Sequence, residues 1–342
     1  MKLATPRWWY VRDQRAAPVL RALLRPIGWI WAGATARRIA RTAPIDAGVP
    51  VICVGNLTVG GTGKTPIVRE LLRLLAEQRV DAAALSRGHG GRLAGPIAVD
   101  PARHTAEDVG DEPLMLARDN RVFVARDRPA GALAAHAAGA RAVVMDDGHQ
   151  NPTLKKTLSL VVVDGESRDG EWPFGDGSVF PAGPMREPLG TGLARADAVI
   201  ILLPADLPAP DPDLLAMLAS RPVLIARLEP LAPPPAGRQL GFAGVGKPWK
   251  VERALAAAGC DLVDFIPLPD HSRFSAETLR FLERRAAELG AGLVTTEKDW
   301  ARLPADWRGR ATPWPVRARF EDEATVAAML EQALGRPRTA PR

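Results

Sequence analysis

The 342-residue sequence predicts an α/β fold, with a mostly parallel β-sheet that carries helices on both faces. Short apolar runs, which are typical of buried strands, alternate with longer stretches that have the apolar spacing of helices. One of these runs leads into a glycine-rich turn that is followed by a helical stretch. The composition, 46% hydrophobic and 25% charged, is ordinary for a globular protein, and the length allows two domains.

The expected elements alternate along the chain from residue 51 onward. Strands are expected at 51–54, 82–85, 122–125, 142–145, 160–163, 198–203 and 223–226, and helices at 65–79, 112–118 and 129–139. Pro and Gly are frequent at 204–212 and 230–237, and the second stretch is the better candidate for a domain boundary. Beyond it the alternation continues in a smaller unit, with strands at 240–243, 262–266 and 293–295 and helices at 247–258 and 275–289.

We therefore expect four parts. These are a basic amphipathic segment at 1–42, a core at 43–229, a smaller C-terminal α/β domain at 238–335 and a disordered tail at 336–342. The two cysteines, Cys53 and Cys260, lie in apolar surroundings without the spacing of metal ligands. This arrangement argues against a disulfide framework and fits a reducing cytoplasm.

Positive charge is concentrated at the N-terminus. Residues 1–42 contain nine Lys or Arg and one Asp, a net charge of +8, whereas the whole chain is +6 and the remainder is therefore −2. A nucleic-acid-binding protein usually spreads basic residues over its binding face. The nearly neutral body therefore argues against nucleic acid as a partner.

The same segment combines its cations with large apolar groups. On a helical projection Arg21 and Arg25 project from one face, and the apolar face is formed by Leu20, Leu23, Leu24, Ile27, Ile30, Trp31 and Ala34. Aromatic rings that suit the headgroup layer of a bilayer are supplied by Trp8, Trp9, Tyr10, Trp29 and Trp31. Pro26 is expected to kink or divide the helix, and the arginines leave no run of about 20 apolar residues to span a bilayer. We expect a helix that lies in the interface of an anionic membrane, with a first helix packed on the body as the alternative.

Residues 51–65 read as a strand, a glycine-rich turn and the start of a helix. The glycines let successive backbone N–H groups converge on phosphate oxygens, and the helix N-terminus adds its positive partial charge. Lys64 would bridge the β- and γ-phosphates of a nucleotide, and the Thr65 hydroxyl would hold Mg²⁺. The pattern G-x-x-x-x-G-K-[ST] has Thr58 in place of its first glycine, and a glycine turn without a ligand is the alternative. The expected nucleotide-binding residues are Thr58, Val59, Gly60, Gly61, Thr62, Gly63, Lys64 and Thr65.

A nucleotide site of this kind needs an acidic group at the end of a neighbouring strand. The apolar run at 141–147 ends in Asp146 and Asp147, and the carboxyl ends of parallel strands line the ligand crevice of such sheets. A surface turn that carries two aspartates is the alternative.

The loop alone does not separate a kinase from a switch GTPase or an ATPase. GTPases carry an N-K-x-D motif that reads the base, whereas Thr296-Glu-Lys-Asp299 lacks the Asn. The order and spacing of eight short motifs resemble the tetraacyldisaccharide 4′-kinase (lipid A 4′-kinase) family from about residue 5 to 330. These motifs are VGNLTVGGTGKTP at 54–66, SRGHGG at 86–91, VGDEP at 109–113, DDGHQ at 146–150, PAGPMREP at 181–188, GFAGVG at 241–246, DHSRF at 270–274 and TTEKD at 295–299.

The resemblance implies a P-loop kinase core with an N-terminal membrane helix, a smaller C-terminal domain and an active site between the two domains. It implies transfer of the γ-phosphate of ATP, with Mg²⁺, to the 4′-hydroxyl of a tetraacylated glucosamine disaccharide 1-phosphate in lipid A biosynthesis. The enzyme would act at the cytoplasmic face of the inner membrane as a peripheral or monotopic protein. No obligate protein partner is evident.

The resemblance also assigns a general base. Asp111 of the GDEP motif would draw the proton from the acceptor hydroxyl, and His271 of the DHS motif would pair with it and orient it. A sugar hydroxyl is a weak nucleophile, so a carboxylate held by an imidazole suits this step. An acid beside a Gly-Pro turn and an ordinary surface histidine are the alternatives.

Other site residues follow from the same motifs. Arg186 and Glu187 would lie beside the transferred phosphate or the substrate, where Arg suits charge that develops on phosphoryl oxygens. A loop salt bridge is the alternative for this pair. Asp147 would hold Mg²⁺ together with Thr65. Second choices for metal or active-site contacts are Asp146, Glu112 and Gln150.

The chain departs from the family pattern at His89, His149, Asn151 and Lys247, none of which is a proposed catalytic group. His149 is expected to make the surroundings of Asp147 more polar. Two other functions remain open on the residues: a nucleotide-switched ATPase of the metallochaperone type, and a kinase for a soluble sugar.

Overall fold

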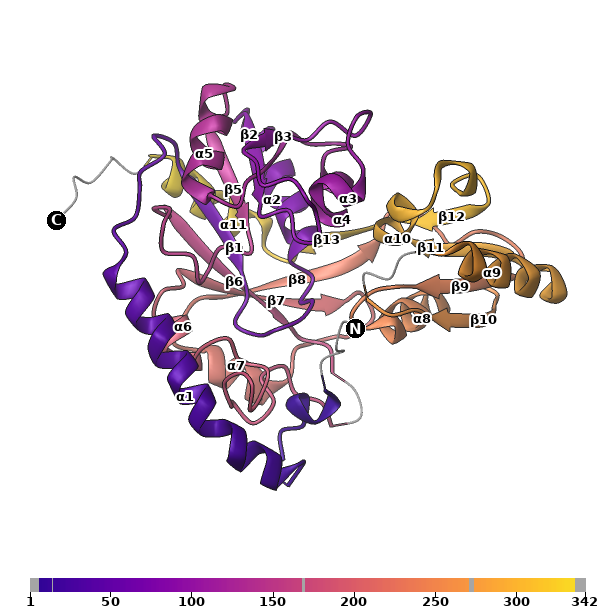
Figure 1. Ribbon diagram of the computed structural model, residues 1–342, viewed down its shortest axis with the longest axis horizontal. Helices are drawn as coiled ribbons and strands as arrows, with labels where there is room; N and C mark the ends of the chain where they lie inside the picture. The colour runs from indigo at the N-terminus through magenta and orange to yellow at the C-terminus, as the bar shows by residue number, and fades with distance from the viewer. Residues whose placement is uncertain (1–5, 14, 168–169, 271–273, 336–342) are drawn as a thin grey trace.

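The computed structural model describes residues 6–13, 15–167, 170–270 and 274–335. In this part of the chain a nine-stranded sheet forms the core, in the order β13-β8-β7-β6-β1-β5-β2-β4-β3 (Figure 1). Its edge strands β3 and β13 pair antiparallel, and the inner strands pair parallel. The strands are β1 Val51–Gly55, β2 Ala82–Ser86, β3 Ile97–Ala98, β4 Val122–Val124, β5 Ala142–Asp146, β6 Leu158–Asp164, β7 Ala198–Pro204, β8 Val223–Pro230 and β13 Val316–Phe320.

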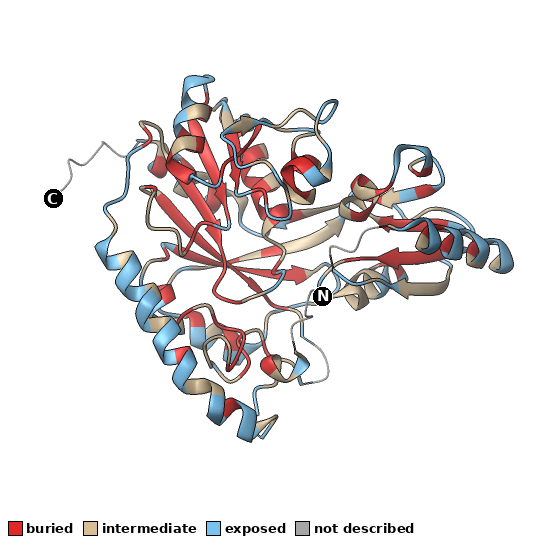
Figure 2. Ribbon diagram, viewed as in Figure 1, coloured by how far each residue is buried: buried red, intermediate tan, exposed pale blue. Residues whose placement is uncertain are grey.

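Helices cover both faces of this sheet, as the continuous apolar runs predict. In β1, Ile52 and Val54 face the cluster that contains helix α2, whereas Val51 and Cys53 face the opposite cluster with α5. The strands are therefore buried on both sides, and Figure 2 shows them at the centre of the core. One face carries α2 (Lys64–Glu77) and α11 (Glu323–Gly335), and the other carries α5 (Arg128–Ala137), α6 (Leu189–Leu193) and α7 (Pro212–Leu218). Two short helices, α3 (Ala106–Val109) and α4 (Asp111–Leu116), precede β4.

The C-terminal unit has its own parallel sheet, in the order β10-β9-β11-β12, and projects from one side of the core (Figure 1). Its helix α9 packs on one face of this sheet and α8 on the other. The elements are β9 Gln239–Ala243, α8 Pro248–Ala257, β10 Leu262–Pro267, α9 Ala276–Leu289, β11 Gly292–Thr296, α10 Glu297–Arg302, the 3₁₀ turn η2 Ala305–Trp307 and β12 Ala311–Trp314.

The end of the described chain returns to the core, whereas we expected residues 238–335 to form one C-terminal domain. Strand β13 pairs with β8 in the large sheet, and α11 packs with α2. The physical reason is burial: Ala318, Phe320 and Leu330 are 0%, 3% and 0% exposed within the core cluster. The chain therefore passes between the core and the C-terminal unit twice, first at 230–237 and again between β12 and β13.

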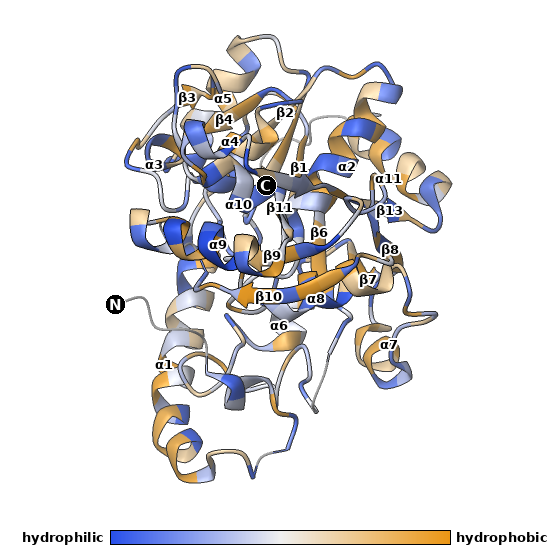
Figure 3. Ribbon diagram, turned by 90° about the vertical axis from the view of Figure 1, so that its right-hand side faces the viewer, coloured by the Kyte–Doolittle hydropathy of each residue, from blue (hydrophilic) through white to orange (hydrophobic). Residues whose placement is uncertain are grey.

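Helix α1 (Pro18–Arg41) lies along the outside of the core and follows the 3₁₀ turn η1 (Arg7–Tyr10) (Figure 1). It continues unbroken through Pro26, which we expected to kink or divide it. Gly28 and the Arg21 side chain, which is 1% exposed, face the body. The opposite face exposes large apolar side chains, 43% to 73% accessible, from Val19, Leu20, Leu23, Ile27, Trp29, Ile30 and Trp31 (Figures 2 and 3).

The helix thus packs on the body through the side that carries Arg21 and Gly28 and turns most of its large apolar side chains outward. The alternative of a first helix packed on the body is therefore seen in the structure, whereas a position in a membrane interface stays a prediction. Among the described residues, no helix combines the length and apolarity needed to cross a membrane.

Candidate active site

The glycine-rich loop lies between β1 and α2 at the carboxyl edge of the large sheet. Gly60 and Gly63 have φ angles of 109° and 76°, a region in which side chains other than glycine are strained. Gly63 caps α2, whose 14 residues begin at Lys64. A Cβ at Gly63 would lie 2.3 Å from Leu202 Cδ2, so this position also requires glycine sterically. The N-terminus of α2 is therefore directed at the loop, which gives the loop the geometry of an anion site.

Two carboxyl groups at the end of β5 face this loop. Asp147 Oδ1 lies 3.3 Å from Lys64 Nζ and 2.9 Å from Arg186 Nη1. Burial opposes ionisation of Asp147, but Lys64 and Arg186 outweigh it and lower the pKa of Asp147 to about 2. The contacts place Lys64, Asp147 and Arg186 in one cluster, as the sequence predicted for the catalytic centre.

The pKa of the neighbouring Asp146 is shifted in the opposite direction. Its carboxyl group is 3% exposed, and burial, reinforced by the charge of Glu112, raises the pKa of Asp146 to about 7 against the opposing charge of Lys64. Asp146 Oδ1 is buried without a hydrogen-bond partner in the described part of the chain, as is Thr62 Oγ1. Unpaired buried oxygen atoms at this point fit a hydrated cation or a phosphate ligand better than a dry core.

A hydrogen-bond network links Arg186 to the start of the loop. Arg186 Nε donates to the Thr58 carbonyl at 2.9 Å, and Gln150 Nε2 donates to the Asn56 carbonyl at 2.9 Å. Gln150 also donates to Glu187 at 2.9 Å, and the buried Glu187 carboxylate accepts two bonds of 2.6 Å from Arg195. The expected residue Gln150 therefore connects Glu187 to the backbone at the start of the loop.

The other two acidic residues of the prediction lie on α4, opposite the C-terminal unit. Asp111 Oδ2 is 3.5 Å from Arg302 Nε, and Glu112 Oε1 is 3.4 Å from Lys298 Nζ, so both contacts cross the boundary to α10. Lys298 also lies 3.7 Å from Asp270 Oδ1. His271, the expected partner of Asp111, is outside the described residues.

The C-terminal unit also approaches the phosphate loop. A Cβ added at Gly246 would lie 3.9 Å from Gly61 N and 3.5 Å from Asp270 Oδ2. The GVG motif of the C-terminal unit, with Asp270 next to it, thus lies beside the loop of the core. The site is bordered by both units of the molecule.

One buried side chain near the site, that of Arg128, was not singled out by the sequence as a contact. Arg128, 3% exposed, donates to the backbone carbonyls of Leu85 and Asp146 at 3.1 and 2.8 Å and so fixes the ends of β2 and β5. Burial lowers the pKa of this guanidinium, and Asp146 opposes the shift. The sequence signal that could have pointed to Arg128 is its place as a basic residue at the start of an Ala-rich helix. Its partners, which are backbone atoms of other strands, could not be read from the sequence.

The departures from the family pattern have structural explanations. His149 is 1% exposed, with ring nitrogens 3.2 Å from Ser159 Oγ and 2.9 Å from the Gly192 carbonyl. Burial lowers the pKa of His149 to about 4, so the ring is a neutral core group at pH 7. Asn151 accepts bonds from Thr153, and Lys247 pairs with Asp164 at 2.9 Å.

A magnesium ion would have few protein ligands here. Within the described residues, no group of three or more His, Cys, Asp or Glu could hold a metal ion. The donors available are the Thr65 hydroxyl and the Asp146 and Asp147 carboxylates, all oxygen ligands of the kind Mg²⁺ prefers. This small set fits a Mg²⁺ ion that is held mainly by phosphates and water.

The chain is similar to known tetraacyldisaccharide 4′-kinases. A family model described as tetraacyldisaccharide-1-P 4′-kinase matches residues 20–335. A tetraacyldisaccharide 4′-kinase of Phenylobacterium zucineum is 68% identical over 96% of this chain and 99% of that protein. The protein of the same name from Maricaulis maris is 52% identical over 96% of both chains.

A solved structure shows the same fold. The crystal structure of LpxK from Aquifex aeolicus in complex with ATP has a TM-score of 0.72, with 24% identity, over 92% of this chain and 99% of that one. The sequence resemblance and the predicted fold class are thereby confirmed. With a family match over most of its length and relatives well above half identical, the chain belongs to the tetraacyldisaccharide-1-P 4′-kinase family.

Proposed function

We propose that this protein transfers the γ-phosphate of ATP to the 4′-hydroxyl of a tetraacyldisaccharide 1-phosphate. The observation that carries the proposal is the cluster of Lys64, Asp147 and Arg186 at a phosphate loop in a chain of this kinase family. The relative with a solved structure is described in complex with ATP.

The roles of the residues follow from their positions. The loop at 58–65 and the N-terminus of α2 bind the terminal phosphates, and Lys64 neutralises charge on the β- and γ-phosphates. Arg186, held by Thr58 and Asp147, places its guanidinium where charge develops on the transferred group. Mg²⁺, held by Thr65 and Asp147 with Asp146 beside them, would neutralise phosphate charge when bound.

The acceptor side is assigned to α4. Asp111 accepts the proton of the 4′-hydroxyl as the oxygen attacks phosphorus, with His271 as its partner. Asp111 and Glu112 border the C-terminal unit through Arg302 and Lys298, so an acceptor sugar would enter between the two units.

The glycolipid acceptor is tied to a membrane surface. The exposed apolar face of α1 and the +8 charge of residues 1–42 support a helix lying in an anionic bilayer surface. We place the protein at the cytoplasmic face of the inner membrane, peripheral or monotopic.

Transfer of label from ATP tests the reaction. The protein is incubated with γ-labelled ATP and Mg²⁺ with no acceptor, with a soluble glucosamine disaccharide, or with tetraacyldisaccharide 1-phosphate in mixed micelles. We expect label in the lipid alone. Label released equally as phosphate in all three arms would indicate a nucleotide-switched ATPase, and label on the soluble sugar would indicate the soluble-sugar kinase.

Vesicle binding tests the membrane surface. Leu23→Ser with Ile30→Ser removes two exposed apolar side chains of α1, each worth about 1.5–3 kcal/mol when buried. We expect the double variant to bind vesicles of anionic phospholipid at least about tenfold more weakly. Leu133→Ser, which changes an exposed leucine on α5, is the control and should bind as wild type. Equal binding by all three proteins would exclude α1 as the membrane surface.

A further inference from the structure

A phosphate loop works only if its backbone carbonyls turn away from the anion. In this loop three consecutive carbonyl groups are held by side chains from outside the loop. Asn56 Nδ2 donates to Thr58 O at 2.9 Å and to Gly60 O at 3.4 Å, and Arg186 also donates to Thr58 O. The carbonyl between them, Val59 O, accepts a 2.6 Å bond from the hydroxyl of Tyr10.

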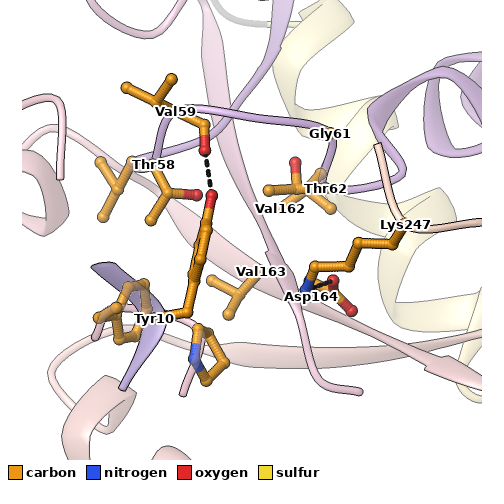
Figure 4. A pocket seen from close by; sticks show the side chains of 12 residues that line it. Tyr10, Thr58, Val59, Gly61, Thr62, Val162, Val163, Asp164 and Lys247 are labelled. Carbon is orange, nitrogen blue, oxygen red and sulfur yellow. Dashed lines mark hydrogen bonds and ion pairs between the residues drawn. The ribbon is translucent and has the colours of Figure 1, made fainter. Parts of the chain in front are cut away.

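Tyr10 comes from the N-terminal segment, 49 residues before its partner, and Figure 4 shows its ring standing beneath the loop with the hydroxyl aimed at Val59. A Cβ added at Gly60 would lie 3.1 Å from this hydroxyl, so the loop closes directly over the ring. Lys247 of the C-terminal unit lies 5.5 Å from the ring centroid, and its amine pairs with Asp164. A cavity of about 20 Å³, room for one water molecule, separates these groups.

The tyrosine is held in place by the surrounding backbone. Its carbonyl accepts a 2.6 Å bond from Trp172 N, and the adjacent Trp9 is 7% exposed and packs edge-on against Phe180 at 5.8 Å. Arg21 of α1 donates to the carbonyls of Trp8 and Val11 on either side of it. The ring therefore has a fixed position relative to both α1 and the phosphate loop.

The loop needs such support because of its sequence. Thr58 stands where the usual pattern has glycine, and Val59 follows it, so two side-chain-bearing residues must adopt the loop conformation. A hydrogen bond to each carbonyl selects the one peptide orientation that leaves the following N–H groups facing the crevice.

We propose that Tyr10 is a positioning residue for nucleotide binding, which makes the N-terminal segment part of the phosphate site as well as a membrane contact. This inference rests on the proposed function. It assigns to Tyr10 no contact with ATP or with the lipid acceptor.

The test is Tyr10→Phe, which keeps the ring and removes only the hydroxyl. Because the Val59 carbonyl loses its partner in a partly buried place, we expect dissociation constants for Mg·ATP and for Mg·tripolyphosphate to rise about three- to tenfold together. The KM for the lipid acceptor and the affinity for anionic vesicles should stay within about twofold of wild type. Phe281→Leu, an aromatic change at an exposed position of α9, is the matched control and should leave both nucleotide constants unchanged.

Two results would contradict the role of Tyr10, and a third would contradict the proposed function. Unchanged binding of both phosphate probes by Tyr10→Phe would overturn the inference. Weaker Mg·ATP binding with unchanged Mg·tripolyphosphate binding would also overturn it, because Tyr10 would then contact the nucleoside. Absence of Mg·ATP binding in the wild type would instead remove the proposed function itself.

Discussion

Adjacent carboxyl groups at the end of β5 are given different protonation states by their surroundings. Asp147, between Lys64 and Arg186, has its pKa lowered to about 2 and stays ionised at neutral pH. Asp146, buried one residue earlier, has its pKa raised to about 7, so this carboxyl group is partly protonated at neutral pH. Neighbouring carboxyl groups with separated pKa values are typical of active sites, where one ionised and one protonatable group serve different tasks.

The role of Asp111 leads to the first prediction. Asp111→Asn keeps the shape of the side chain but removes the proposed base, so kcat should fall by at least about a hundredfold. The dissociation constant for Mg·ATP should change less than about threefold, because Asp111 lies on α4 and not on the phosphate loop. Both quantities are measurable on the same protein by label transfer and calorimetry.

A control and a contrary result complete this test. Asp46→Asn changes an exposed carboxylate paired with Lys155 and should leave kcat unchanged. A wild-type kcat in Asp111→Asn would contradict its assignment as the base, whatever the state of His271.

Residues that belong to sequence motifs could be predicted from the sequence, whereas residues that hold the site in place through hydrogen bonds could not. The glycines, Lys64, Asp147 and Arg186 were found because a short spacing rule or the family pattern marks them. Tyr10 and Arg195 act through partners 49 and 8 positions away, and neither belongs to a recognisable motif. Only the folded chain shows which backbone atoms such side chains reach.

At the scale of elements, α1 approaches the body closely at one of its glycines. A Cβ at Gly28 would lie 2.8 Å from the Val179 carbonyl oxygen, whereas a Cβ at Gly33, in the same helix, would have no atom within 4 Å. Gly28→Ala should therefore lower the free energy of unfolding by about 1–3 kcal/mol and speed tryptic cleavage within residues 1–41. Gly33→Ala should raise the free energy of unfolding by up to about 1 kcal/mol, since alanine is the better helix former.

The two variants are compared by denaturant titration and limited proteolysis. Opposite signs are the expected result. Equal effects of the two substitutions would show that α1 does not pack against residues 178–180 in solution.

Helix α3, which leads into Gly110 and Asp111, gives a pH-dependent prediction. Asp108 accepts bonds from Thr105 N and Thr105 Oγ1 at 2.9 and 2.8 Å, and from Arg92, and these lower the pKa of Asp108 to about 2. Because the folded pKa is below the ordinary value of 3.8, the stabilisation is complete above about pH 4 and is lost as pH falls through about 2.

The difference in unfolding free energy between wild type and Asp108→Asn should follow this window. Urea titrations at pH 7, 4, 3 and 2.5 should show a constant difference down to about pH 4 and a shrinking one below it. A difference that does not change between pH 4 and 2.5 would contradict the capping role of the charged carboxylate.

The inner strands were predictable because each is one continuous apolar run buried on both faces. Strands β12 and β13 were not, since Pro313, Arg317 and Arg319 interrupt their apolar pattern. The burial of the Arg21 side chain of α1 could not be predicted either, because Asp176, with which it pairs, lies 155 residues further along the chain.

At the scale of the whole molecule, the core is completed by the end of the chain. Truncation after residue 315 removes β13 and α11, including Phe320 and Leu330, which are buried against α2. Because each such side chain contributes about 1.5–3 kcal/mol and domains are stable by only about 5–15 kcal/mol, we expect this protein to lose cooperative thermal unfolding. Truncation after residue 335 is the matched control and should unfold as the full chain does. Cooperative unfolding of the shorter protein would show that residues 238–335 form an independent domain after all.

The two units meet through charged pairs on both sides of the phosphate loop. Lys247 and Lys250 of the C-terminal unit contact Asp164, while Lys298 and Arg302 contact Glu112 and Asp111. The molecule therefore places a nucleotide loop from one unit beside acidic and basic groups supplied by both. The chemistry of phosphoryl transfer depends first on that loop.

The most direct measurement is equilibrium binding of Mg·ATP to the full-length protein and to Lys64→Ala, without bilayers. The loop geometry predicts saturable binding of one nucleotide by the wild type and an affinity about a hundredfold lower in Lys64→Ala, with unchanged melting temperature. Equal affinities in the two proteins, or no saturable binding by the wild type, would contradict the assignment of residues 58–65 to the nucleotide's terminal phosphates.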